Sequence, residues 1–310
     1  MALATIKNVG KRLGGKWALW DVALEIEAGE IMGILGRSGS GKTALARVLA
    51  GLDEPTSGAV LLRGRQDDRP FHVSVALDPP ASAGELTVYE NLDMFGALWG
   101  LPRMTRIKEI AFLLELLKLG DARNNPACRL SGGEHRRLEI ARALLADSPL
   151  TVIDCLLDNL DASVYEKLWD HMLSLRRNDA RSFLVLTGSG KVAEVCQKIA
   201  VMHRGRIVFV GRADDFRRLA GEDVVVLGDM CGPLLKNRIQ EQFSVIIKEE
   251  DGFLSFRVGH GDKMVSELLA EFGTELSCVY LKRPTLDDAL DVLASGGTSV
   301  AASAGVEQGG

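Results

Sequence analysis

The stretch Gly36-Arg37-Ser38-Gly39-Ser40-Gly41-Lys42-Thr43 decides the fold of this 310-residue chain. An apolar run from Glu30 to Leu35 precedes it and predicts a short buried strand, and Ala44 to Ala50 follow it with a helical pattern. The spacing GxxxxGK followed by Ser or Thr lets backbone N–H groups wrap phosphates, brings a lysine to the outer phosphates and offers a hydroxyl to Mg²⁺. Because a strand precedes it and a helix follows it, the stretch predicts a phosphate-binding loop.

A second motif, Leu130-Ser131-Gly132-Gly133-Glu134, comes before a helical pattern that runs from His135 to Leu144. The first turn of such a helix has free N–H groups, and the serine adds a hydroxyl there. We therefore expect a second anion-binding helix end in the same chain. The phosphate loop occurs in kinases, motor ATPases and transporters alike. The second motif reduces the number of these protein classes that the sequence fits.

Length and composition restrict the classes to which this protein can belong. The length suits about two domains of roughly 150 residues, and 46% apolar residues suffice for packed cores. No run approaches the ~18 apolar residues that span a bilayer, and the N-terminus lacks a secretory signal, so we expect a soluble, cytoplasmic protein. The 37 basic and 42 acidic residues give a net charge of −5, which argues against a nucleic-acid partner. Five scattered cysteines without a CxxC pair predict reduced thiols and no zinc site.

The order of elements predicts two domains and a tail. Apolar runs alternate with helical patterns over residues 1–221, which predicts an α/β domain, with a helical insertion at about 85–145. A small α+β domain is expected over 222–295, and the glycine-rich residues 296–310 suit a disordered tail. The expected elements after the insertion are strands at 150–153, 183–186, 199–202, 207–210, 224–227, 243–247, 253–258 and 277–281, and helices at 263–272 and 286–293.

The two motifs resemble those of ATP-binding-cassette (ABC) ATPases, with Gly36–Thr43 as the Walker A loop and Leu130–Glu134 as the signature. The resemblance implies an α/β P-loop cassette with a mixed sheet, an antiparallel β lobe and a helical lobe, which binds ATP and Mg²⁺. It implies a second cassette packed head to tail, so that each ATP lies between one Walker A loop and the other signature. The residues that it places at nucleotide are Gly36, Ser38, Gly39, Ser40, Gly41, Lys42 and Thr43 at the chain's own site, and Ser131, Gly132, Gly133 and Asp161 toward the partner cassette.

The resemblance also implies polytopic membrane subunits, which would hold the chain at the cytoplasmic face of a membrane and touch the turn at Ala81 to Thr87. The stretch from Leu281 to Leu290, which contains Pro284-Thr285-Leu286-Asp287-Asp288, resembles the C-terminal extension of cassettes that power drug, polysaccharide and haem-related exporters. We therefore expect an exporter. In this family the membrane subunit selects the transported substrate.

Two departures from the family's pattern affect catalysis at the chain's own site. Asp154 keeps the Walker B carboxylate at the end of a strand, but Cys155 stands where the family has the glutamate that polarises the attacking water. The family's histidine that contacts the γ-phosphate is replaced by Thr187 or by Gly188, depending on the alignment. General-base assistance is worth about 10²–10⁴ in rate, so the loss of the glutamate alone predicts slow hydrolysis.

Two further departures affect metal and base binding. Asp78 aligns with a metal-binding glutamine and still offers an oxygen to Mg²⁺, so the expected metal ligands are Thr43, Asp154 and Asp78. Leu13 stands where an aromatic residue usually stacks on adenine, which weakens base stacking. Trp17 or Trp20 is a possible substitute, although buried packing is the expectation for both.

All four departures concern the ATP at the chain's own Walker A loop, whereas the signature serves the partner's ATP. We therefore interpret the chain as the degenerate half of a heterodimer, which binds Mg-ATP with little or no hydrolysis and completes a competent site on a second cassette. The alternative is a soluble, non-transport ABC protein that acts as an ATP-gated clamp or regulator. A small-molecule P-loop kinase would leave Leu130–Glu134 unexplained.

Overall fold

The computed structural model describes residues 2–63, 73–77, 81–228, 233–250, 253–273 and 275–294. The chain divides into two compact units after Ala213, which is earlier than the expected boundary at Gly221. The boundary moves because a short 3-10 helix, η2 (Arg218–Ala220), lies against the last helix of the second unit, α10 (Leu286–Ala294). The expected tail at 296–310 lies outside the described residues.

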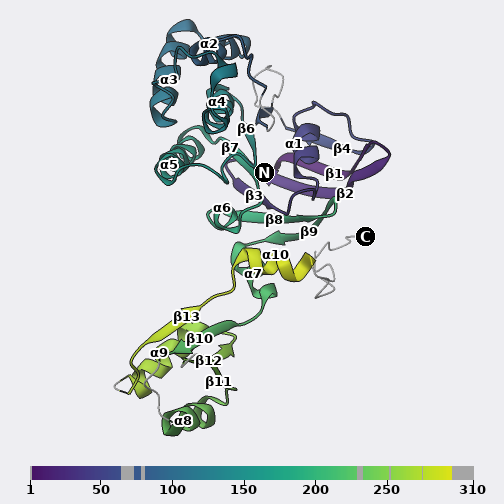
Figure 1. The fold of residues 1–310 in the computed structure, drawn as a ribbon. Coiled ribbons are helices and arrows are strands. Elements are labelled where there is room, and N and C mark those ends of the chain that lie inside the picture. The colour runs from purple at the N-terminus through teal and green to yellow at the C-terminus, as the bar shows by residue number, and fades with distance from the viewer. Residues whose placement is uncertain are drawn as a thin grey trace. The chain divides into compact units, whose positions relative to one another are not determined.

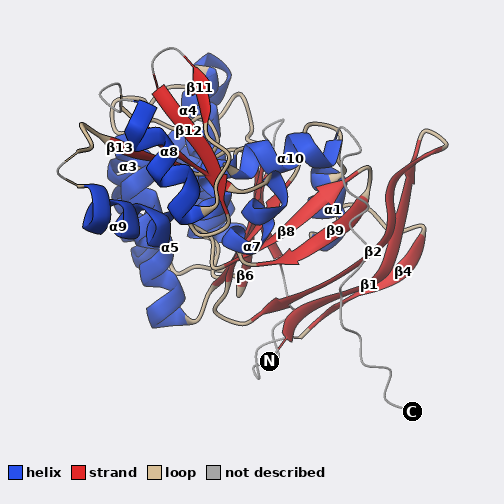
Figure 2. Ribbon diagram, turned by 90° about the horizontal axis from the view of Figure 1, so that it is seen from below, coloured by secondary structure: helices blue, strands red, loops and turns tan. Residues whose placement is uncertain are grey.

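A six-stranded sheet forms the centre of the first unit (Figures 1 and 2). In order across the sheet, its strands are β5 (Val73–Ala76), β6 (Leu150–Asp154), β7 (Ser182–Thr187), β3 (Ile31–Leu35), β8 (Lys198–His203) and β9 (Arg206–Gly211). All neighbours pair in parallel except β8 and β9, which form the expected hairpin. Parallel strands end at one edge of a sheet, so Leu35 and Asp154 lie close to the end of β7: Leu35 pairs with Thr187 and Asp154 with Leu186.

The expected antiparallel lobe is present as a three-stranded sheet in the order β2-β1-β4. Its strands are β1 (Ala2–Leu13), β2 (Lys16–Glu27) and β4 (Ser57–Leu62). Helix α1 (Lys42–Leu49) follows the phosphate loop, and its buried Leu45 and Leu49 share one apolar core with β1 and β2. This packing fixes the helix that starts at Lys42 against both sheets.

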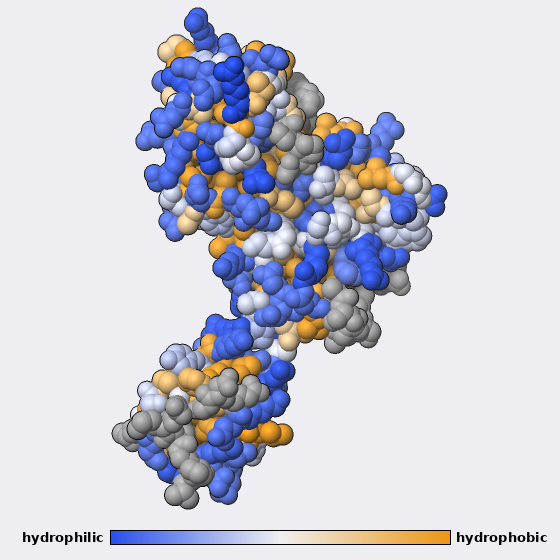
Figure 3. All heavy atoms as spheres, viewed as in Figure 1, coloured by the Kyte–Doolittle hydropathy of each residue, from blue (hydrophilic) through white to orange (hydrophobic). Residues whose placement is uncertain are grey.

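The expected helical insertion contains α2 (Val88–Leu98), α3 (Arg103–Leu116) and α4 (Gly132–Leu145), at the top of Figure 1. Helices α5 (Ala162–Asp179) and α6 (Gly190–Glu194) follow β6 and β7. Hydrophilic residues cover much of the face seen in Figure 3, with smaller apolar patches between them. Within the described ranges, no helix combines the length and the apolar character needed to cross a bilayer.

The second unit is the expected α+β domain, preceded by the short helix α7 (Ala213–Arg217). Its sheet is antiparallel in the order β11-β12-β10-β13, with a helix after β10 and another after β12, which is the split βαβ arrangement. The elements are β10 (Asp223–Leu227), α8 (Pro233–Phe243), β11 (Lys248–Glu250), β12 (Phe253–Val258), α9 (Gly261–Phe272), β13 (Val279–Lys282) and α10.

One expected strand of this unit is wrong. Residues 243–247 do not form a strand, because Phe243 ends α8 and β11 begins only at Lys248. Helix α8 was missed, although Leu235, Ile239 and Phe243 recur every four residues and pack on the apolar core of the sheet.

Candidate functional site

The phosphate loop connects the end of β3 to the start of α1, and its glycines are required by its shape. Gly39 and Gly41 have φ values of 76° and 110°, in the left-handed region that favours glycine. A Cβ on Gly36 would stand 2.5 Å from the carbonyl oxygen of Met202, and one on Gly41 would stand 2.6 Å from that of Ala18. These glycines therefore let the loop take its left-handed turns and pack closely on the backbone at Met202 and Ala18, a shape that suits a phosphate-binding loop.

Lys42 is the loop's buried cation. Its Nζ donates to the carbonyl oxygens of Gly36 (2.6 Å) and Arg37 (3.2 Å). Both partners are neutral carbonyls, so the amine can turn to a phosphate without breaking an ion pair. Ser40 is buried beneath the loop, whereas Ser38 and Thr43 are exposed. The loop thus offers backbone amides, one cation and exposed hydroxyls to a bound nucleotide.

Two of the three expected metal ligands, Asp154 and Thr43, suit a Mg²⁺ ion that is shared with phosphate. Asp154 ends β6 and is buried, and Thr43 lies in the first turn of α1. Asp78 lies outside the described residues. Among the residues that the structure describes, no three His, Cys, Asp or Glu side chains group to hold a metal. Mg²⁺ typically needs only one or two carboxylates when phosphates and water complete its shell, so Asp154 and Thr43 suit that role.

Cys155 follows Asp154 in a left-handed conformation, with a φ of 56°. Its backbone N–H donates to the carbonyl oxygen of Leu186 (2.8 Å), which fixes the turn at the sheet edge. Burial and, after it, the charge of Asp154 raise the pKa of the Cys155 thiol to about 12, and the thiol also hydrogen-bonds to the Asp154 carboxylate. The side chain is therefore protonated at neutral pH, and it cannot accept a proton from water as a carboxylate does.

The end of β7 meets the phosphate loop, because the backbone N–H of Gly36 donates to the carbonyl oxygen of Thr187 (3.1 Å). Thr187 and Gly188, the two alternatives for the histidine position, both contact Asp158. The Thr187 hydroxyl donates to one carboxylate oxygen of Asp158, and the Gly188 N–H donates to the other (2.9 Å). Sequence reasoning missed Asp158, whose only signal was an acidic side chain in the loop between β6 and α5.

The signature motif lies at the start of α4 on the helical lobe. Ser131 caps this helix through a reciprocal pair of contacts: its hydroxyl accepts from the Glu134 N–H (3.3 Å), and the Glu134 carboxylate accepts from the Ser131 N–H (2.8 Å). Hydrogen bonds from Ser131 lower the pKa of Glu134. Gly132 is exposed and Gly133 half-buried, with open space at the Cβ position of Gly132. This helix end is therefore accessible to an anion from outside the chain.

Asp161, the residue before α5, connects to the same helix. Its carboxylate forms an ion pair with Arg137 of α4 at 3.8 Å and is 73% exposed. The structure thus brings Asp161 toward the signature helix, while the residues of the phosphate loop, Asp154 and Thr187 gather at the edge of the central sheet.

The aromatic residues near Leu13 do not pack as expected. Leu13 is exposed at the end of β1. Trp17 and Trp20 are also 37% and 41% exposed, with ring centroids 4.8 Å apart, and the Arg12 guanidinium lies 4.5 Å from the Trp17 ring. The expectation of buried packing for these tryptophans is therefore wrong, and both rings offer surface at this lobe.

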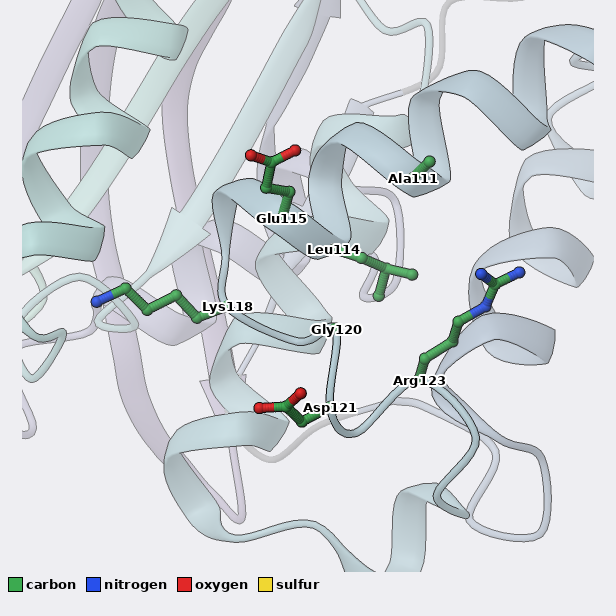
Figure 4. Close-up of a pocket in the computed structure, with 7 residues that line it drawn as sticks. All are labelled: Ala111, Leu114, Glu115, Lys118, Gly120, Asp121 and Arg123. Carbon is green, nitrogen blue, oxygen red and sulfur yellow. The ribbon is translucent and has the colours of Figure 1, made fainter.

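Two hollows lie away from the phosphate loop. One, of about 540 Å³, is between α3 and the turn after it, where Lys118, Glu115 and Arg123 point in different directions (Figure 4). Lys118 is bound to Ser163 (2.7 Å), so no polar groups converge there. The other is a groove of about 1320 Å³ lined by the end of α1, β4 and the turn from Leu98 to Pro102.

The fold and the site define this protein as an ATP-binding cassette. The family model described as ABC transporter matches residues 19–155. A probable sulfate/thiosulfate import ATP-binding protein of Chlorella vulgaris is 34% identical over 221 residues, which cover 68% of this chain and 91% of that protein. The chain therefore belongs to the family of ABC transporter ATP-binding subunits, and ATP is its nucleotide.

Other relatives differ in transport direction and in length. The Nod factor export ATP-binding protein I of Ralstonia nicotianae is 28% identical, with 75% of this chain and 77% of that protein covered. A solved dimeric cassette in a post-hydrolysis state, bound to ADP and Pi, has a TM-score of 0.60 and 27% identity over 67% of this chain and 98% of that chain. The chain spans 64% and 58% of the length of two import ATPases that it matches. Most named relatives are import ATPases, so the expectation of an exporter is not confirmed.

Proposed function

We propose that this subunit binds Mg-ATP at its own phosphate loop with little or no hydrolysis and supplies its signature to a second, competent cassette. The observation that carries the proposal is the side chain at position 155. A thiol with a pKa of about 12, hydrogen-bonded to Asp154, supplies no general base where the attacking water would lie. The end of β7 adds no imidazole, because it carries Thr187, Gly188 and Ser189.

Binding itself requires neither a base nor an imidazole. The glycine cradle, the buried Lys42 amine and the Asp154 carboxylate at the sheet edge remain in place. Backbone N–H groups and one lysine supply most of the attraction for phosphates in loops of this kind. Impaired chemistry at this site is therefore compatible with nucleotide binding.

The partner cassette is proposed to be non-identical. Ser131 caps α4 and leaves the helix start accessible, so the groups that would serve a partner's ATP are retained. Two copies of this chain would pair two sites that both carry a thiol at position 155. A partner with a glutamate there would gain one competent site from the pairing.

We also propose that polytopic membrane subunits hold the cassette at the cytoplasmic face of a membrane and that closure of the cassette dimer moves them. ABC transporter ATPases work with such subunits, and the groove lined by the end of α1, β4 and the turn from Leu98 to Pro102 is where we place a cytoplasmic segment of them. Leu98 is 77% exposed there. We retain export as the proposed direction because of the stretch from Pro284 to Asp288. Uptake or efflux of labelled substrates in vesicles that contain the whole transporter tests it.

The central experiment measures ATP binding and ATP hydrolysis by the purified chain with Mg²⁺, with Lys42→Ala as the control that removes the loop cation. We expect Lys42-dependent binding and phosphate release close to that of Lys42→Ala. Robust Lys42-dependent turnover by the unmodified chain would refute the impaired site, and a self-sufficient homodimer would then be the better interpretation. Co-purification with a polytopic membrane subunit encoded near this gene, rather than with soluble proteins only, tests the transporter assignment.

A further inference from the structure

Asp158 is an acidic residue near the phosphate loop that has no role in the proposed function. It is half-buried in the loop between β6 and α5, and both of its carboxylate oxygens are held by the end of β7. The Thr187 hydroxyl donates to one oxygen, and the Gly188 N–H donates to the other at 2.9 Å. The Ser189 N–H in turn donates to the Thr187 oxygen (2.9 Å), which fixes the hydroxyl toward the carboxylate. The position of this negative charge is therefore set by the fold.

The carboxylate lies beside the phosphate loop. A Cβ placed on Gly188 would stand 3.6 Å from Asp158 Oδ2 and 3.8 Å from the Gly36 carbonyl oxygen. That same carbonyl oxygen accepts from Lys42 Nζ at 2.6 Å. Asp158 is thus on the side of the loop where the lysine amine lies.

The lysine of such a loop reaches the β- and γ-phosphates, so its amine marks the end of the site that the outermost phosphate occupies. A γ-phosphate bound at the Lys42 amine would lie on the same side of the loop as this fixed carboxylate, whereas an ADP molecule ends one phosphate earlier.

We propose that Asp158 is a selectivity residue, whose carboxylate lowers the affinity of this site for ATP relative to ADP. This inference rests on the proposed function in that a nucleotide must bind at Gly36–Thr43. For one unit charge several ångströms from a phosphate, Coulomb's law with a dielectric between those of protein surface and water gives an effect of about tenfold in affinity. We expect the charge to change the affinity for nucleotide, because both carboxylate oxygens of Asp158 already accept hydrogen bonds and the carboxylate therefore keeps its position.

The test compares the dissociation constants of ATP and ADP, both with Mg²⁺, by calorimetry on the full chain. Asp158→Asn and Asp158→Ser remove the charge in two ways, and the second avoids placing an amide group against the Gly188 N–H. Thr187→Val removes a hydrogen bond but keeps the charge. Asp170→Asn is the matched control, because it removes one exposed carboxylate from α5.

We expect both neutral variants at position 158 to raise the affinity for ATP about tenfold and to leave that for ADP within twofold, with the ratio unchanged in Asp170→Asn. Thr187→Val should shift the ratio by less than the neutral variants do. An ATP-to-ADP ratio that stays within about twofold of the wild type in both Asp158→Asn and Asp158→Ser would overturn the selectivity role. In that case Lys42-dependent binding would still uphold the nucleotide site. Absence of binding by the wild type would instead overturn the proposed function and the inference together.

Discussion

Replacement of Cys155 by alanine tests whether its thiol takes part in hydrolysis. With a pKa of about 12, the thiol is ionised in roughly one molecule in 10⁵ at pH 7, which corresponds to about 7 kcal/mol for forming the thiolate. General-base assistance is worth about 3–5 kcal/mol of barrier. The cost of ionisation exceeds the gain, so we expect Cys155→Ala to retain the residual turnover within about threefold.

Replacement of the same residue by glutamate should have the opposite result. A glutamate at position 155 would lie next to Asp154, whose charge raises its pKa, but it would still be mostly ionised at pH 7. The left-handed backbone adds no new strain, because Cys155 already adopts it at a φ of 56°. We expect turnover to rise by roughly 10- to 100-fold, below the full effect of a base, because Thr187 and Gly188 supply no imidazole.

Phosphate release by the purified chain, at saturating ATP and Mg²⁺ and between about pH 6 and pH 9, measures both effects. Lys42→Ala gives the background rate. A loss of more than about tenfold in Cys155→Ala would refute the reasoning. So would a wild-type rate that rises with pH through this range and loses that rise in Cys155→Ala, because the thiol would then titrate far below its expected pKa.

Two further predictions concern the helical lobe. Arg142→Ala should lower the free energy of unfolding in urea by about 3–5 kcal/mol, because the arginine pairs with the buried Glu139 at 2.7 Å and its guanidinium lies 4.6 Å from the centre of the Phe95 ring. Replacement of both Arg142 and Glu139 by leucine should restore most of this stability. Equal losses in the single and the double variant would contradict this prediction. Hydrogen bonds from Ser131 lower the pKa of Glu134 below its ordinary value of 4.5, so these bonds stabilise the fold fully above pH 4.5 and lose their effect as the pH falls through the lowered pKa. Glu134→Gln should therefore be less stable than the wild type at pH 7 and equally stable in acid. A stability difference that persists in acid would refute the role of the charge.

The sequence predicted those parts of the site that depend on local spacing. The glycines and Lys42 form the phosphate loop because their order along the chain fixes the turn between β3 and α1. The motif Leu130–Glu134 predicted the start of the helix α4, and Asp154 ends a strand because the apolar run stops there. The comparisons confirm the cassette fold that these motifs predicted.

Features that depend on contacts between residues far apart in the sequence could not be predicted from the sequence. The hydrogen bond between Asp158 and Thr187 joins one residue that precedes α5 in the sequence to another that follows it. These two residues meet because of the register in which β6 and β7 pair. A strand was predicted at 243–247 because Val245 and Ile247 have side chains that favour strands. In the structure these two residues belong to the linker between α8 and β11 and pack on the apolar core. Local propensity was outweighed there by tertiary packing.

The groups proposed to serve the partner's ATP and those at the chain's own site have separate structural supports. Ser131 is held by Glu134 within the first turn of α4, and Arg137 of the same helix reaches Asp161. Cys155 is held instead by a backbone bond to Leu186 at the edge of the central sheet. A replacement at position 155 therefore changes the chemistry at the sheet edge without removing any contact that shapes the signature. This separation gives a physical reason why the proposed loss of the base at position 155 is compatible with an accessible signature helix in the same chain.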